Sequence, residues 1–208
     1  MMKLILRYLS IIFIAAGSAY NVFSQIDGSL VSQSDFRTTM EILLVDNTML
    51  QRELIINIID NRSGNDEAIE NLRKKQIDIG NALRPYYRDE ITNQLTKLLD
   101  GHVTASIEFF KAVKNEDAND LETAKQKWYT NADSILMYLD GSAPFVSSNE
   151  MTQAVHELLS ATIDEALAHL KKNSTAETTA YEKVHGQIII IADMFADAVI
   201  KQFPEKFI

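Results

Sequence analysis

LLDGHVTASIEFFKAVKNEDANDLETAKQKWYTNAD, residues 98–133, is the stretch that decides the fold. Apolar side chains recur every three or four positions on both sides of a polar segment, 114–120, which is typical of two amphipathic helices joined by a loop. Short loops make successive helices antiparallel neighbours. We therefore predict a helical hairpin here, with a polar residue midway along each arm: His102 in the first arm and Asn131 in the second.

The same pattern occurs three times along the chain. Polar residues in the first arms lie 55 and 54 residues apart, and each second-arm partner follows by 29 to 31 residues. The six positions are Asn47, Asp78, His102, Asn131, His156 and His185. No segment shows the two-residue alternation of a strand. The sequence therefore predicts an all-α fold, an up-and-down bundle of six helices built from three repeated helical hairpins.

Turn signals divide the predicted helices. Gly (7) and Pro (3) are scarce in the 208 residues, and five of them lie at interruptions of the apolar pattern: Gly64, Pro85, Gly141, Pro144 and Pro204. The predicted turns lie at 61–65, 84–86, 114–119, 140–147 and 172–175.

The N-terminal segment has the organisation of a secretory signal peptide. Lys3 and Arg7 precede an uncharged apolar run, 8–16, and small residues suited to cleavage follow. An uncleaved membrane anchor is the alternative, but the run is short for a span of about 20 residues. We predict a signal peptide at 1–24, a flexible leader at 25–34 and a single helical-bundle domain at 35–208. The mature protein is expected to be exported, in the periplasm or outside the cell, and not in the membrane.

Composition limits the partners and the chemistry. Residues 1–24 contain two basic residues and no acidic ones, so cleavage would change the net charge from −9 to −11. A domain with this negative charge is a poor binder of nucleic acid and of anionic lipid, because both are negatively charged themselves. The chain has no Cys, which excludes disulfides, thiolate metal sites and Cys nucleophiles. An exported domain without disulfides must depend on its core for stability, and 46% of the residues in the chain are hydrophobic.

The six polar positions fall on or beside apolar stripes. A core-facing polar side chain costs free energy unless it is hydrogen-bonded, so six in step suggest a shared internal layer. One interpretation is a site for a small ligand or a divalent metal, because bundle cores build such sites from facing helices. The predicted metal ligands are His102, His156, His185 and Asp78, with Asn47 and Asn131 as neighbours. The alternative is a structural or protein-interaction module whose polar residues form only a hydrogen-bond network.

Other residues give weaker signals. Three glycines inside predicted helices, Gly80, Gly101 and Gly186, lie close to the polar positions and suggest close backbone approach or room for a ligand. His169 lies off the apolar stripe of its helix and is expected to face solvent. Aromatic residues at helical spacing could line a pocket but more often belong to a core. They are Tyr86, Tyr87, Trp128 and Tyr129.

Enzyme signatures are absent from the sequence. It contains no Glu-x-x-His or His-Glu-x-x-His metal motif, no Gly-x-Ser-x-Gly elbow and no phosphate-binding glycine loop. Nothing in the sequence therefore favours a hydrolase, kinase or dehydrogenase.

Four segments resemble an uncharacterised family of bacterial helical-bundle proteins. The resemblance implies a helical bundle and no established function. It also implies His at the position of Asn47, where this chain departs from the pattern. With their flanks, the segments cover most of residues 40–207. They are QIDIGNALRPYY (76–87), LTKLLDGHVTAS (95–106), KWYTNADSI (127–135) and IKQFPEKF (200–207).

Overall fold

The computed structural model describes residues 30–142 and 149–208. The predicted signal peptide, 1–24, lies outside the described residues, as do the first residues of the predicted leader and most of the predicted turn at 140–147. Export therefore stays a prediction.

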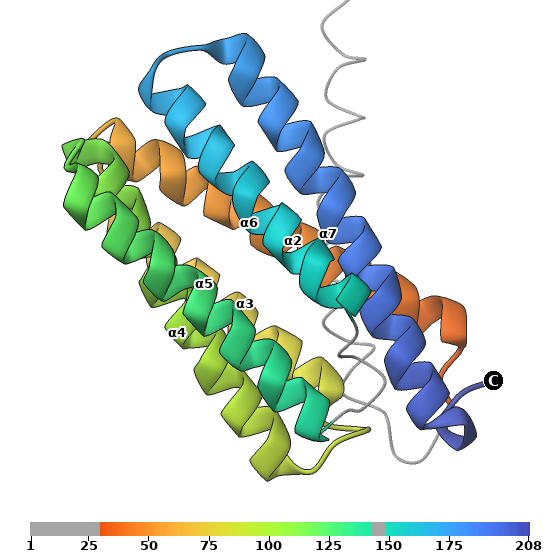
Figure 1. The fold of residues 1–208 in the computed structure, drawn as a ribbon. Coiled ribbons are helices and arrows are strands. Elements are labelled where there is room, and N and C mark those ends of the chain that lie inside the picture. Colours follow the sequence, from red (N-terminus) through yellow and green to blue (C-terminus); the bar gives the residue numbers. More distant parts are fainter. Residues whose placement is uncertain (1–29, 143–148) are drawn as a thin grey trace, which may run out of the picture.

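The described chain forms six long α-helices and one short 3₁₀ helix (Figure 1). The all-α prediction is confirmed, since the described residues contain one isolated β-bridge and no strand. None of these helices combines the length and the apolar character needed to cross a bilayer. The elements are α2 (Gln33–Ile59), α3 (Asn65–Leu83), α4 (Asp89–Asn115), α5 (Ala118–Ser142), α6 (Asn149–Leu170), α7 (Ser174–Gln202) and η3 (Pro204–Lys206).

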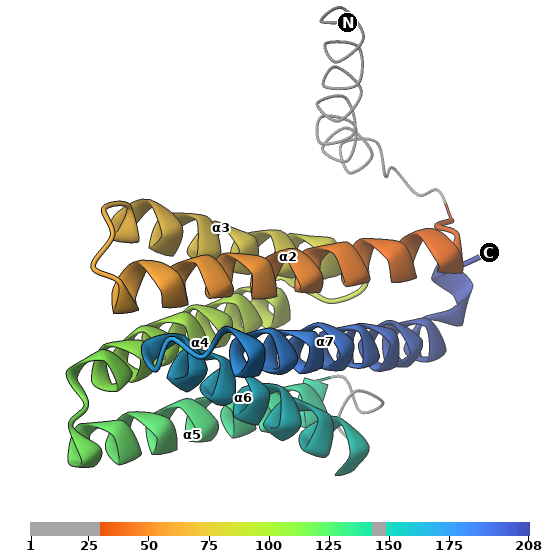
Figure 2. The same cartoon turned by 90° about the horizontal axis from the view of Figure 1, so that it is seen from above.

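The helices are arranged as a closed ring around a small centre. Each helix packs against the next one in the chain, and α7 returns to pack against α2. In Figure 2, α2 and α3 lie side by side, as do α6 and α7. The first helices of the three predicted hairpins, α2, α4 and α6, also contact one another. These three helices therefore meet at the centre of the bundle, and all six contribute buried residues.

The three turns that join α2 to α3, α4 to α5 and α6 to α7 share one backbone feature. Each contains a residue other than glycine in the left-handed region: Asn61 (φ 56°), Glu116 (φ 55°) and Lys172 (φ 55°). A left-handed residue is a common way to end a helix and reverse the chain. Its recurrence at intervals of 55 and 56 residues agrees with the period of the predicted hairpins.

The two ends of the described chain are tied together. The backbone of Val31 pairs with the C-terminal residues, through Val31 N–H to Lys206 O (3.2 Å) and Ile208 N–H to Val31 O (3.0 Å). Figure 2 shows the C-terminus beside the start of α2. The predicted leader is therefore wrong over its last residues, because Val31 is paired and α2 already begins at Gln33.

An aromatic cluster lies at this end of the bundle. Phe207 is buried, stacks on Tyr86 with ring centroids 5.1 Å apart, and contacts Phe36 at 5.3 Å. Tyr87 packs edge-on against Phe203. The segments containing Arg-Pro-Tyr-Tyr and Gln-Phe-Pro-Glu-Lys-Phe thus meet in space. Tyr86 and Tyr87 therefore belong to the core, as their helical spacing predicted.

The core consists of two apolar clusters. One lies at the aromatic end and includes Met40, Leu95 and Phe195. The other lies toward the three turns and includes Leu54, Phe110 and Trp128. Along α2, α3, α4 and α5 the change from one cluster to the other occurs at or next to a hydrogen-bonded polar residue.

The helical glycines differ in their surroundings. A Cβ on Gly80 would collide with the hydroxyl of Thr96 on α4, and one on Gly101 would lie 3.1 Å from Nδ2 of Asn131. A Cβ on Gly186 would meet no atom within 4 Å. The close approach predicted from sequence is therefore present at Gly80 and Gly101, and it is absent at Gly186.

We expect the substitutions Gly80→Ala and Gly186→Ala to act in opposite directions. Gly80→Ala should lower the free energy of unfolding by about 1–3 kcal/mol, because the added methyl group overpacks the α3–α4 contact. Gly186→Ala should raise it by about 0.5–1 kcal/mol through helix propensity alone. Urea denaturation measures both effects. Thr96→Ala should rescue Gly80→Ala, and equal effects of the two glycine substitutions would contradict the packing described here.

Glu116→Gly should stabilise the protein. Glu116 is exposed and has a φ of 55°, where a side chain costs about 1–2 kcal/mol relative to glycine. Part of that gain is lost to the greater freedom of glycine in the unfolded chain, so we expect an increase of about 0.5–1 kcal/mol in urea denaturation. Glu122→Gly, in the exposed interior of α5, is the control and should destabilise by about 1 kcal/mol.

Candidate functional site: a polar layer beside an apolar cavity

His102 makes two hydrogen bonds inside the bundle, one with each ring nitrogen. The indole N–H of Trp128 donates to Nε2 at 2.9 Å, so Nε2 carries no proton. Nδ1 lies 2.8 Å from Oδ1 of Asn131 and donates to it. The network thus assigns a neutral imidazole with its proton on Nδ1.

Burial lowers the pKa of His102 from 6.5 to about 4, and the hydrogen bond to Asn131 opposes this shift only in part. Desolvation penalises the imidazolium, and protonation would also place a proton against the Trp128 N–H. Asn131 is held in turn by a hydrogen bond from Nδ2 to the carbonyl of Leu98 (3.3 Å). The His102–Asn131 pair therefore connects α4 to α5 as a fixed, uncharged unit.

A similar pair connects α2 to α3. Nε2 of Gln76 donates to Oδ1 of Asn47 at 2.6 Å and to the carbonyl of Leu72 at 2.8 Å. Gln76 is buried, with 3% of its surface exposed. We call Asn47, Gln76, His102 and Asn131 the polar layer. Both of its pairs join residues 29 positions apart.

The prediction of Asp78 as the partner of Asn47 is wrong. Two residues correspond to more than half a turn of helix, so Asp78 and Gln76 point in different directions. Gln76 is the one that reaches Asn47. The 29-residue spacing of the other two predicted pairs leads from Asn47 to Gln76, and this was the signal that could have identified it.

His156 and His185 do not join the polar layer. Nε2 of His156 lies 2.7 Å from Oδ1 of Asp133 on α5, in a pair that is 39% and 52% exposed. The ring of Tyr129 packs edge-on against His156 at 5.2 Å. His185 is exposed on α7 beside Tyr181. The expectation of one internal layer in all three hairpins is therefore wrong for the third.

The predicted metal ligands are consequently separated. His102 has both nitrogens engaged within the bundle, His156 binds Asp133 at the surface, His185 is exposed and Asp78 is on α3. Within residues 30–142 and 149–208, no three His, Asp or Glu side chains are placed to hold a metal ion. The arrangement of the layer is that of a hydrogen-bond network.

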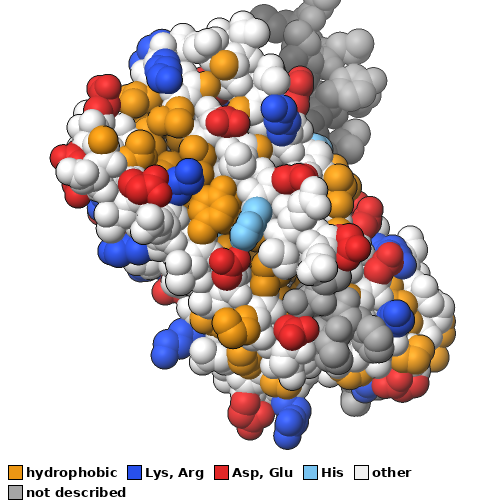
Figure 3. All heavy atoms as spheres, in the orientation of Figure 1, with side chains coloured by type: hydrophobic (Ala, Val, Ile, Leu, Met, Phe, Trp, Pro, Cys, Tyr) orange, Lys and Arg blue, Asp and Glu red, His pale blue; other side chains and the backbone are white. Residues whose placement is uncertain are grey.

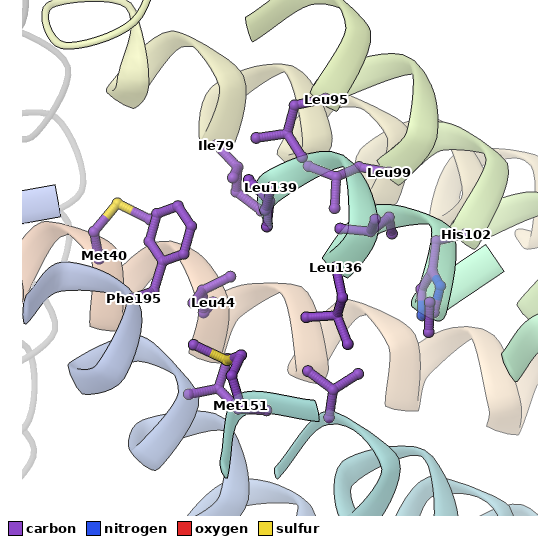
Figure 4. Close-up of a pocket in the computed structure, with 14 residues that line it drawn as sticks. Met40, Leu44, Ile79, Leu95, Leu99, His102, Leu136, Leu139, Met151 and Phe195 are labelled. Carbon is purple, nitrogen blue, oxygen red and sulfur yellow. The ribbon is translucent and has the colours of Figure 1, made fainter. Parts of the chain in front are cut away.

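An apolar cavity of about 160 Å³ borders His102 of the polar layer, on the side of the aromatic end. Side chains from all six long helices line it, and Figure 4 shows them converging on one space. Its lining contains one polar side chain, His102. The others are Met40, Leu44, Ile79, Leu95, Leu99, Ala132, Ile135, Leu136, Leu139, Met151, Val155, Ile191 and Phe195.

A charged cluster near the three turns was missed by sequence reasoning. Arg52 on α2 pairs with buried Glu165 on α6 and with Glu177 on α7, the latter at 2.9 Å. Its guanidinium also lies 4.4 Å from the ring centroid of Tyr181. Burial raises the pKa of Glu165, although Arg52 opposes the shift. Apolar periodicity carries no signal for such a cluster, because its members lie on the polar flanks of their helices.

His169 belongs to this charged cluster, so the prediction that it faces solvent is wrong. Its side chain is 12% exposed. Its Nε2 lies 3.3 Å from an Asp60 oxygen and its Nδ1 lies 3.2 Å from a Glu177 oxygen. A hydrogen bond from Lys172 lowers the pKa of Asp60 to about 2. The cluster joins the ends of α2, α6 and α7 through paired charges.

Comparison of the chain with protein-family models, curated proteins and solved structures gives no match. This agrees with the resemblance of the sequence to a family without an established function.

The pKa of His102 predicts how stability depends on pH. Between pH 6.5 and about 4, the unfolded chain binds a proton at His102 that the folded protein excludes, so the free energy of unfolding falls as the pH falls. The loss attributable to His102 should be roughly 2–3 kcal/mol between pH 7 and pH 4.5. Urea denaturation at the two pH values measures it.

Two variants isolate this contribution. His102→Gln should lower stability at pH 7 and should lose much less on going to pH 4.5. The exposed His185→Gln is the matched control and should lose as much as the unmodified protein. An equal loss in all three proteins would show that His102 is not excluded from protonation in the folded state.

Proposed function

We propose that this protein binds a small, uncharged, apolar molecule in the cavity at the centre of its bundle. The observation that carries the proposal is the cavity itself, about 160 Å³ of space lined from six helices with one polar side chain among its walls. The predicted signal peptide, if cleaved, would make this an exported binding protein.

An empty space of this size is costly. Protein interiors are close-packed, so unfilled space among apolar side chains costs free energy that grows with its volume. The wall atoms lose the dispersion contacts that a filled core provides. A ligand that occupies the space restores those contacts, so only the ligand-free protein has this loss of stability.

The chemistry of the walls specifies the ligand. A polar or charged molecule needs partners, and the one polar group in the lining, His102, already has both ring nitrogens hydrogen-bonded. Apolar cavities of about 150 Å³ stay dry and bind molecules such as benzene or xenon. The same occupation of His102 gives less support to the metal site predicted from sequence.

The alternative function is a structural or protein-interaction module whose core holds only a hydrogen-bond network. The two pairs of the polar layer favour it as well. The exposed large hydrophobic side chains of the described helices lie on α2, α3, α5 and α7. On the face shown in Figure 3, hydrophobic side chains are interspersed with acidic and basic ones. The surface therefore does not distinguish the two functions, and the cavity is the feature that favours an interior ligand over a protein partner.

Thermal unfolding with small hydrocarbons tests the proposal. Benzene, cyclohexane or n-hexane at about ten times its dissociation constant should stabilise the protein by about 1.4 kcal/mol, raising the melting temperature by about 3–5 °C. Leu136→Phe fills the cavity and should abolish the increase. Met137→Phe, next to it on α5 but 73% exposed, should retain it.

Trp128 provides a second measurement. It is the one Trp of the chain and its indole bonds His102, which lines the cavity, so its fluorescence should respond to a bound ligand. If none of the hydrocarbons changes the melting temperature or this fluorescence, the binding function is wrong and the network alternative stands.

A further inference from the structure

We infer that the ligand is an unbranched alkyl chain, or the alkyl segment of a larger molecule; this inference rests on the proposed function. The cavity is elongated along the bundle, and its two ends differ in rigidity. Both properties suit a chain better than a ring.

The lining residues show the elongation. On α4 the cavity is lined at Leu95, Leu99 and His102, which are on successive turns and span about 10 Å at 1.5 Å per residue. On α5 it is lined over the same span, from Ala132 to Leu139. A round space of the same volume would touch fewer turns of each helix.

Figure 4 shows the same geometry directly. Met40 and Phe195 lie at one end and His102 lies at the other, with Leu44 and Leu136 between them. A cavity of about 150 Å³ binds benzene, which has six carbons, so one of about 160 Å³ accommodates roughly five or six methylene groups in a row.

The two ends differ in how far they can adapt. His102 is fixed by hydrogen bonds from Trp128 and to Asn131, so this end is a rigid stop. The other end is lined by two methionines, Met40 and Met151, beside Phe195. Methionine side chains are flexible and fill irregular space, so this end can yield to chains of different length. The geometry points to a site that accepts a short series of chain lengths.

The decisive comparison is n-hexane against cyclohexane, which have the same number of carbons and differ in shape. Dissociation constants are measured by Trp128 fluorescence in sealed samples and corrected for the water solubility of each hydrocarbon. We expect n-hexane to bind at least tenfold more tightly. Before that correction, the affinity should rise about fourfold per added methylene from n-butane to n-hexane, and the rise should stop once the cavity is full.

Two variants locate the ends of the chain. Ala132→Leu adds bulk beside the rigid end and should move the best chain length down by one or two carbons. Met151→Ala enlarges the adaptable end and should move it up. Circular dichroism shows whether each variant folds. If one does not, the comparison of n-hexane with cyclohexane in the unmodified protein still decides the inference.

The outcomes separate the two proposals. If cyclohexane or benzene binds as tightly as n-hexane, or if affinity does not depend on chain length, the chain inference is wrong and the binding function stands. If no hydrocarbon binds, the function itself fails. Tighter binding of n-hexane with a limit near six carbons supports both.

Discussion

The interior of this protein depends on keeping one partly buried imidazole uncharged and fully hydrogen-bonded. His102 achieves this with a donor on one side, Trp128, and an acceptor on the other, Asn131. A bond length of 2.8 Å between α4 and α5 fixes both the separation and the register of these helices at that level. The Asn47–Gln76 bond does the same for α2 and α3. Because a buried polar group without its partner costs about 1–3 kcal/mol, these pairs resist any sliding of the helices.

The polar layer also explains why a cavity can persist beside it. In an apolar core, neighbouring helices move together until voids close, since each lost contact costs dispersion energy. Here the helices are held apart at the layer by hydrogen bonds of fixed length, and the apolar side chains next to it cannot draw them closer. At the far end, the aromatic cluster around Phe207 ties the start of α2 to the turn after α3. The cavity lies between these two fixed points.

Much of the fold could be predicted from the sequence, because a helix period of three to four residues and the turn residues determine which faces are buried. That pattern predicts the hairpins, the turns outside 143–148 and the inward position of His102 beside Asn131. The pattern does not determine which helix each face packs against. Periodicity places His156 and His185 near an apolar face, and only the packing of α6 against α5 and α7 decides that they lie outside the core. The cavity could not be predicted at all, because it depends on side-chain volumes from six helices at once.

The placement of charge completes the argument for an apolar ligand. The carboxylates of Glu165 and Glu177 are paired with Arg52, and Asp60 is paired with Lys172, all near the turns. These charges hold α2, α6 and α7 together and do not line the cavity. The one ionisable group that does line it, His102, remains neutral down to about pH 4. At neutral pH, the central space therefore has no charge with which to bind or position an ion. Shape and apolar contact are what remain to select the proposed ligand.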